Sequence, residues 1–140
     1  MEVFPEALAE SFLRVSRRLR GETQRRIAPL GVNLHQSRAL RTIAEQGPLR
    51  PSELAGQLGI TPRSATDSVA PLLASGLVQR RTDPGDGRAY LLAIAPAGEE
   101  ALAGIGRARA EVGAELFGRL SPGEREALAT LLDRLGEERP

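Results

Sequence analysis

Residues 78–94 read VQRRTDPGDGRAYLLAI and differ from most of the 140-residue chain around them. Two stretches with strand character, residues 77–82 and 89–94, flank the sequence DPGDG at residues 83–87. Asp, Pro and Gly are the residues that form tight turns. The stretch therefore predicts a β-hairpin with a charged tip, in a chain whose other segments show mainly helical periodicity.

Two capped helices precede this hairpin. A short helix is predicted over residues 51–58, and Gly59 suits its C-terminal cap. A second helix begins after Thr61, whose hydroxyl suits an N-cap, and it continues to Gly76. Pro71 lies inside it and is expected to remove one hydrogen bond and kink the axis. Two helices joined by a tight turn and followed by a hairpin predict a winged helix-turn-helix.

The flanking segments predict four more helices, over residues 5–28, 33–46, 96–120 and 122–135. The first and last carry apolar stripes at helical spacing. A long terminal helix cannot bury such a stripe alone, so we expect a dimer interface there. The aromatic side chains are expected to pack in the core rather than line a ligand pocket. The stripes and aromatic residues are Leu8, Phe12, Val15, Leu19, Leu128, Leu131, Leu132, Leu135, Tyr90 and Phe117.

These elements give a fold class that is mainly α with a small β-hairpin wing. We divide the single domain, residues 1–140, into a winged helix-turn-helix lobe over residues 33–95 and a helical dimerisation region. That region consists of residues 1–30 and 96–140. Apolar runs are too short to span a membrane, and no secretory signal is recognisable, so a cytoplasmic protein is expected.

Composition excludes several kinds of site. The chain has no cysteine and one histidine, His35, so it offers no disulfide, no thiolate nucleophile and no His/Cys cluster for a metal. No nucleophile–base pair or phosphate-binding glycine loop is present, so we expect neither an enzyme nor a cofactor. His35 itself is expected at the surface or in a dimer interface.

Charge is only weakly informative. The net charge is +1 overall: +2 over residues 1–30, +2 over residues 31–95 and −3 over residues 96–140. The N-terminal and middle parts are thus mildly basic and the C-terminal part is acidic, well short of a strongly basic nucleic-acid-binding domain. A helical protein-interaction module, with a winged helix that no longer reads DNA, therefore remains the alternative to a DNA-binding regulator.

The second helix of the pair has the composition of a recognition helix. Its first turns carry short polar groups and could enter a major groove about 12 Å wide. The hairpin would reach the neighbouring backbone or minor groove. We expect Arg80 and Arg81 to divide between a phosphate contact and a salt bridge, without assigning which does which. The candidate DNA-contacting residues are Ser52, Thr61, Pro62, Arg63, Ser64, Thr66, Asp67, Arg81, Asp86 and Arg88.

Taken together, these segments resemble the MarR family, named for the multiple-antibiotic-resistance regulator. The resemblance covers nearly the whole chain, and its most specific parts are the GLV sequence, the Asp-Pro-x-Asp-x-Arg wing and the following helix start. The residues that carry it are Ser52–Ala55, Ile60–Thr61, Ser64–Thr66, Leu72–Val78, Arg80–Arg81, Asp83–Arg88 and Pro96–Gly98.

The resemblance implies a homodimer that binds a pseudo-palindromic operator in double-stranded DNA. It implies a repressor released by a small aromatic or anionic effector, with Arg88 in the minor groove and Asp86 holding it in place. Four positions depart from the pattern: Gly87 for a second Arg, Asp67 for a basic residue, Ala95 for a capping Thr, and Arg50 for a capping Ser or Thr. They put the operator sequence in question more than the fold.

Overall fold

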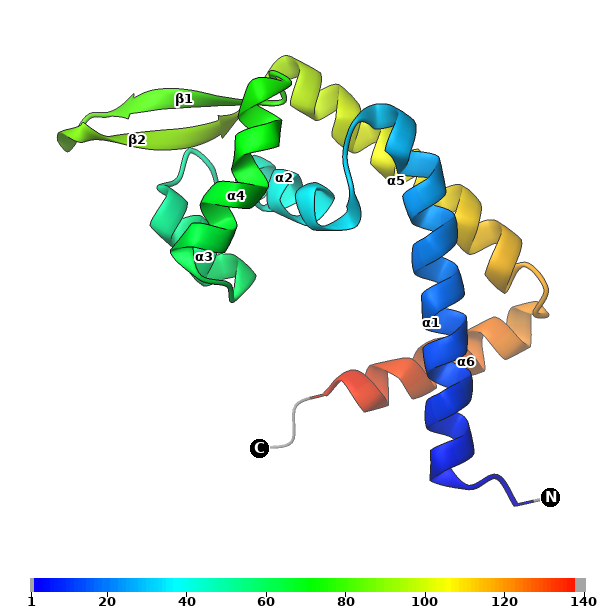
Figure 1. Cartoon of the computed structure of the whole chain (residues 1–140). Helices are drawn as coiled ribbons and strands as arrows, with labels where there is room; N and C mark the ends of the chain where they lie inside the picture. Colours follow the sequence, from blue (N-terminus) through cyan, green and yellow to red (C-terminus); the bar gives the residue numbers. More distant parts are fainter. Residues whose placement is uncertain (1, 138–140) are drawn as a thin grey trace.

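The computed structural model describes residues 2–137. Within them the chain is mainly helical, with six α-helices and a two-stranded antiparallel hairpin, as predicted (Figure 1). A lobe of short helices carries the hairpin on one side, and the long first and fifth helices run down the other. The elements are α1 (Pro5–Ile27), η1 (Ala28–Leu30), α2 (Leu34–Gln46), α3 (Pro51–Leu58), α4 (Pro62–Ala74), β1 (Val78–Asp83), β2 (Asp86–Ile94), α5 (Pro96–Phe117) and α6 (Pro122–Gly136).

Helix ends in the lobe follow their capping residues. The Asn33 side chain accepts a bond from the Gln36 amide at 2.8 Å, and the Gln36 side chain accepts one from the Asn33 amide at 3.0 Å. The Thr61 hydroxyl accepts a bond from a first-turn amide of α4. Gly59 and Gly76 end α3 and α4 at φ of 64° and 76°. This left-handed backbone conformation is unfavourable for residues that carry a Cβ. These caps confirm the predicted boundaries of α2, α3 and α4.

The hairpin is longer than predicted. β2 begins at Asp86 rather than Ala89, and Asp83 pairs with Asp86 after a bulge, so only Pro84 and Gly85 form the turn. At the other end of the hairpin, Leu49 exchanges two backbone hydrogen bonds with Leu92, at 3.1 and 2.8 Å. A single pair from the segment before α3 therefore extends the two-stranded sheet at its base.

The core lies in the lobe and draws on nearly every element. Its most deeply buried large side chains come from α1, α2, α3, α4 and both strands, and α5 adds Ala101, Ile105 and Ala108. The others are Ile27, Leu40, Ile43, Leu54, Leu72, Val78 and Leu92. The lobe is thus joined to the last turn of α1 and the first turns of α5 by one continuous apolar core.

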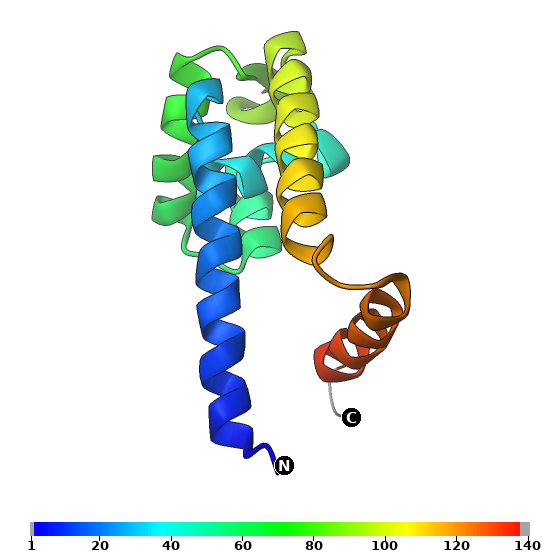
Figure 2. The same ribbon diagram turned by 90° about the vertical axis from the view of Figure 1, so that its right-hand side faces the viewer.

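The terminal helices are built differently. The described residues of α6 include none that is buried, and α1 buries only Thr23 and Ile27 near its end. Figure 2 shows the first half of α1 and the whole of α6 extending away from the lobe. Phe12 is 56% exposed, so its expected place in the core is wrong for the single chain. α5 also stops at Phe117, not at residue 120 as predicted.

None of the helices within residues 2–137 is both long enough and apolar enough to cross a membrane.

Candidate DNA-binding surface

α3 and α4 form the predicted helix-turn-helix, with only residues 59–61 between them. Ala65 and Val69 are buried at 0% and 3% exposure, and Val69 belongs to the same core cluster as Leu54 of α3. An α-helix has 3.6 residues per turn, so residues three or four apart lie on the same face. The remaining residues of the first turns of α4 therefore face outwards. These are Pro62, Arg63, Ser64, Thr66 and Asp67, and all five are exposed.

The hydroxyl groups of this surface are partly engaged within the helix. Thr61 donates to the Ser64 hydroxyl at 2.9 Å while it caps α4, and Thr66 donates to the Pro62 carbonyl at 3.0 Å. Arg63 and Asp67, in contrast, form no ion pair within residues 2–137. The free charges at the start of α4 are therefore one guanidinium and one carboxylate, one turn apart.

The wing tip is organised by its carboxylates. Asp86 accepts a hydrogen bond from the Arg88 backbone amide at 3.0 Å. Within residues 2–137 the two side chains form no ion pair, so Asp86 holds the Arg88 backbone and leaves its guanidinium exposed. Sequence reasoning singled out both residues, and the structure brings them together through this backbone contact.

Arg50 and Asp83 form a second contact that sequence reasoning missed. Arg50 Nε and Nη2 each lie 2.7 Å from Asp83 Oδ2, and Asp83 Oδ1 accepts from the Gly85 amide at 2.9 Å. The Gly85 bond, followed by the Arg50 guanidinium, lowers the pKa of Asp83. The hydrogen bond from Arg50 to Asp83 likewise raises the pKa of Arg50.

The two arginines of β1, Arg80 and Arg81, lie in different environments. Arg80 lies over the ring of Tyr90, with 4.6 Å between the guanidinium carbon and the ring centre. Arg81 is exposed on the neighbouring position of β1 and forms no ion pair within residues 2–137. The salt bridge expected for one of the pair is thus replaced by a cation–π contact, and Arg81 keeps its candidate role.

The remaining singled-out residues lie close to this surface. Ser52 is exposed in the first turn of α3. His35 is exposed on α2 and lines a shallow hollow with Arg38, Ser64 and Ser68. No group of three potential metal-ligating side chains occurs within residues 2–137. His35 therefore belongs to no three-ligand cluster in this part of the chain.

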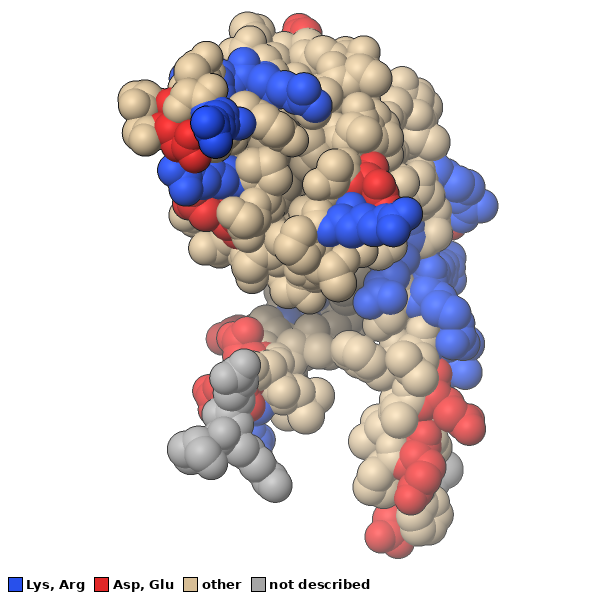
Figure 3. Space-filling model, turned by 60° about the vertical axis from the view of Figure 1, so that its left-hand side comes forward, with Lys and Arg blue, Asp and Glu red and all other residues tan. Residues whose placement is uncertain are grey.

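Basic side chains gather in separate patches over the lobe rather than in one continuous field (Figure 3). Acidic side chains lie in a row along the start of α1 in the same view, where the sequence places Glu2, Glu6 and Glu10. The arginines of the lobe, which contains the wing and α4, are therefore available to an anionic partner, whereas the start of α1 presents negative charge.

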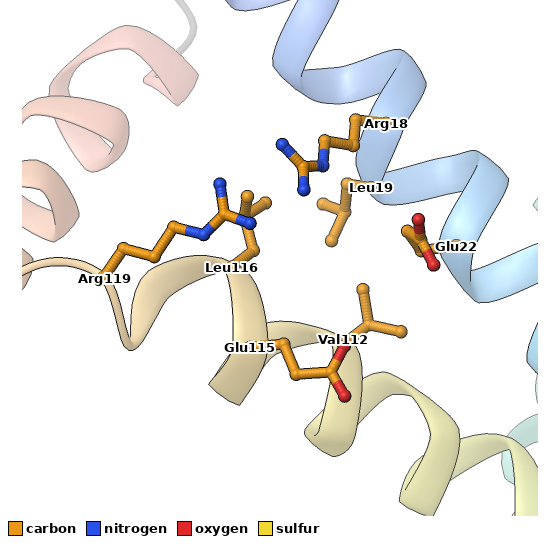
Figure 4. Close-up of a pocket in the computed structure, with 7 residues that line it drawn as sticks. All are labelled: Arg18, Leu19, Glu22, Val112, Glu115, Leu116 and Arg119. Carbon is orange, nitrogen blue, oxygen red and sulfur yellow. The ribbon is translucent and has the colours of Figure 1, made fainter.

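A cavity of about 90 Å³ lies between α1 and α5 (Figure 4). The guanidinium groups of Arg18 and Arg119 point into the same space, above an apolar floor. Neither forms an ion pair within residues 2–137. The floor and the remaining rim consist of Leu19, Glu22, Val112, Glu115 and Leu116.

The carboxylates at this cavity already have partners. Glu115 accepts a hydrogen bond from Arg26 at 2.5 Å, and that bond lowers the pKa of Glu115 and raises the pKa of Arg26. Glu22 pairs with Arg25. The two unpaired guanidinium groups therefore dominate the local charge.

Comparison with known proteins identifies the family. The sequence profile described as MarR family matches residues 32–90. The HTH-type transcriptional regulator Mb0904 of Mycobacterium bovis is 35% identical over 126 residues, which is 90% of this chain and 85% of that protein. The chain belongs to the MarR family. It is accordingly an HTH-type transcriptional regulator and not an enzyme, and members of this family bind DNA.

Solved structures of MarR-like proteins share the fold. The YusO protein from Bacillus subtilis superposes with a TM-score of 0.83 at 19% identity, covering 96% of this chain and 95% of that one. The MarR family protein RV2887 of Mycobacterium tuberculosis, in complex with p-aminosalicylic acid, gives a TM-score of 0.72 at 22% identity. That match covers 93% of this chain and 98% of RV2887. At these identities the likeness concerns the fold.

Proposed function

We propose that this MarR-family protein is a homodimeric cytoplasmic repressor that binds a pseudo-palindromic site in double-stranded DNA and is released by a small anionic ligand. The observation that carries the proposal is the exposed polar face of α4 beside a wing whose Arg88 guanidinium is unpaired within residues 2–137. A regulator needs both features, since a helix in the major groove reads bases and a wing contacts the adjacent groove.

The proposed contacts divide by chemistry. Arg63 can donate two bonds to a guanine edge, and Asp67 can accept one from a cytosine amino group. Ser52 and Arg81 are placed to meet phosphates, and Arg88 to enter the minor groove. Thr61, Pro62, Ser64, Thr66 and Asp86 complete the proposed surface, as groups that approach the DNA closely or position their neighbours.

The dimer is proposed from the terminal helices. Between α1 and α6 lies an open apolar groove of about 730 Å³, lined on one side by Leu8 and Phe12 and on the other by Leu128, Leu131 and Leu135. An exposed apolar surface of this kind marks an interaction site. A second copy carries the same stripes, so a two-fold interface covers both grooves and places two α4 helices on adjacent half-sites. This assigns dimerisation to residues 1–30 and 96–140.

The effector is proposed from the cavity between α1 and α5. Two converging guanidinium groups above an apolar floor suit a small carboxylate with an aromatic or aliphatic body. RV2887, which shares the fold, has been crystallised with such a molecule, p-aminosalicylic acid. Because α5 also packs on the core of the lobe, a ligand here can change the spacing of the two α4 helices.

The test is a footprint on DNA upstream of the protein's own gene, at low and high salt. A protected pseudo-palindrome of roughly 20 base pairs is expected, lost at high salt because phosphate contacts release counterions. Salicylate added at low salt is expected to remove the protection from the wild type but not from Arg119→Ala. Protection that resists salicylate would contradict the effector proposal while leaving the DNA site standing.

The second candidate is a protein-interaction module whose lobe no longer reads DNA. Asp67 at the start of α4, Gly87 in the wing and the net charge of +1 favour it. Absence of protection at low salt, with a folded dimer in solution, would support this function over the first.

A further inference from the structure

The tip of the wing is tied to the start of α3. Arg50 is the residue before α3, and Asp83 is the last residue of β1. Both Nε and Nη2 of Arg50 lie 2.7 Å from one oxygen of Asp83, and the other oxygen accepts from the Gly85 amide. The Asp83 side chain is 9% exposed and the Arg50 side chain 46%. One carboxylate thus joins the turn of the wing to the helix-turn-helix.

The position of this contact along the hairpin matters. Leu49 pairs with Leu92 at the base of the sheet, opposite Arg80. Asp83 lies three residues further along β1, about 10 Å towards the tip at the usual rise of a strand. Arg50 directly follows Leu49, and its long side chain covers the remaining distance to Asp83. Arg50 therefore reaches past the base and fastens the hairpin near its turn.

A two-stranded hairpin is marginally stable by itself, and its tip needs support from outside the strands. The turn that Asp83 closes continues directly into Asp86 and Arg88, the proposed minor-groove group. A wing whose conformation is already fixed before binding loses less conformational freedom when it binds DNA.

We propose that Arg50 and Asp83 form a latch that fixes the wing tip relative to α3 and α4, so that Arg50 is a positioning residue for DNA binding. The inference rests on the DNA-binding role proposed for the wing. It explains why an arginine stands at the cap position of α3, where its side chain makes no capping hydrogen bond. Glu53 instead accepts a bond from the Arg50 backbone amide at 3.3 Å.

The most diagnostic variant is Asp83→Asn. It keeps the shape of the side chain and an oxygen for the Gly85 amide, and it removes one negative charge. By charge alone this change strengthens binding to DNA, since a repulsive group is lost. A latch predicts the opposite sign, a loss of about three- to tenfold in operator affinity. Arg50→Ala is expected to weaken binding as well, and the double variant is expected to be no weaker than Arg50→Ala.

A spectroscopic measurement tests the latch without DNA. The chain has no cysteine, so Gly87→Cys allows one nitroxide label at the wing tip. A Cβ at Gly87 meets no atom within 4 Å, and the same holds for Gly56 on α3, the control position. Asp83→Asn and Arg50→Ala are expected to increase label motion at residue 87 and leave it unchanged at residue 56.

The outcomes separate the latch from its rivals. If Asp83→Asn binds DNA as tightly as wild type or tighter, and label motion at residue 87 is unchanged, the latch is overturned. If only Arg50→Ala weakens binding, with the salt slope reduced by about one, Arg50 is a direct phosphate contact and not a positioning residue. A wild type that binds no DNA contradicts the proposed function, whereas the label measurement still decides whether the latch exists.

Discussion

The winged-helix lobe and the terminal helices contain similar amounts of apolar sequence but bury it differently. In the lobe, Leu40, Leu54 and Leu72 are at most 1% exposed, and every helix from α2 to α4 contributes to the core. In the terminal helices, Leu131 is 52% exposed and Leu135 is 79% exposed. The same residue type is thus core in one region and surface in the other.

This difference indicates where each region obtains its stability. Burying a leucine side chain contributes about 1.5–3 kcal/mol, which the lobe gains from its own chain. The terminal helices gain almost none of it until something covers them. The lobe should therefore fold from its own contacts, whereas the terminal helices should depend on the terminal helices of a second copy of the chain.

The largest effect is expected when the terminal stripe is broken. Leu131→Asp places a charge in the apolar groove and should abolish the dimer, leaving single lobes on half-sites. Operator affinity then falls by about 100-fold or more, because the second lobe no longer benefits from the effective concentration that the first creates. Sedimentation velocity and a DNA titration measure the two losses. Thr130→Asp, exposed on the opposite face of α6, is the control and should remain dimeric.

A second pair of variants sharpens the contrast between core and interface. Leu72→Ala leaves a cavity in the lobe and should cost about 2–5 kcal/mol of unfolding free energy at any protein concentration. Leu131→Ala should lower the melting temperature by an amount that depends on protein concentration, since it acts on association. Melting curves over a 100-fold concentration range separate the two. Equal concentration dependence for both variants would contradict a self-sufficient lobe.

A smaller effect is expected from a change in the wing that leaves both cores intact. Arg88→Ala removes an exposed guanidinium and should weaken operator binding about tenfold, with the dimer and the melting temperature unchanged. Arg107→Ala, which removes an exposed arginine from α5, is the matched control and should bind like wild type. An affinity within about twofold of wild type would show that the wing assignment is wrong.

The smallest effect is expected in the pH dependence of the stability of the fold. The pKa of Asp83 is lowered in the folded protein, so its contribution to stability is present above the ordinary pKa of an aspartate and is lost as the pH falls through the lowered value. Wild type should be more stable than Asp83→Asn at pH 7, and the two should converge in strong acid. Thermal melts across this range test the sign. A difference that grows with acid would rule out the ion pair as its source.

Much of the lobe could be predicted from sequence because its signals are local. Asn33, Thr61 and Gly76 act within one turn of themselves, and helical periodicity places Ala65 and Val69 inwards with Arg63 outwards. The turn chemistry at Asp83 predicted the hairpin. It did not fix the start of β2, because Asp86 and Gly87 are equally suited to a turn.

The rest depends on contacts that sequence spacing does not encode. Arg50 and Asp83 are 33 residues apart, and no local pattern pairs them. For Phe12 the sequence supported two expectations, a place in the core and a place in an interface stripe, and helical periodicity could not decide between them, because an apolar stripe looks the same whether it meets its own chain or another. Asp83 in an Asp-Pro-Gly turn was the one available signal, since such carboxylates usually bond their own backbone.

The most direct test of the account is the composition of the complex on its operator. Native mass spectrometry of the wild type with the roughly 20-base-pair duplex found by footprinting should show two chains per duplex, and Leu131→Asp should lose this species. One wild-type chain per duplex, or equal binding to a scrambled duplex, would contradict a dimer that reads DNA through its two winged-helix lobes.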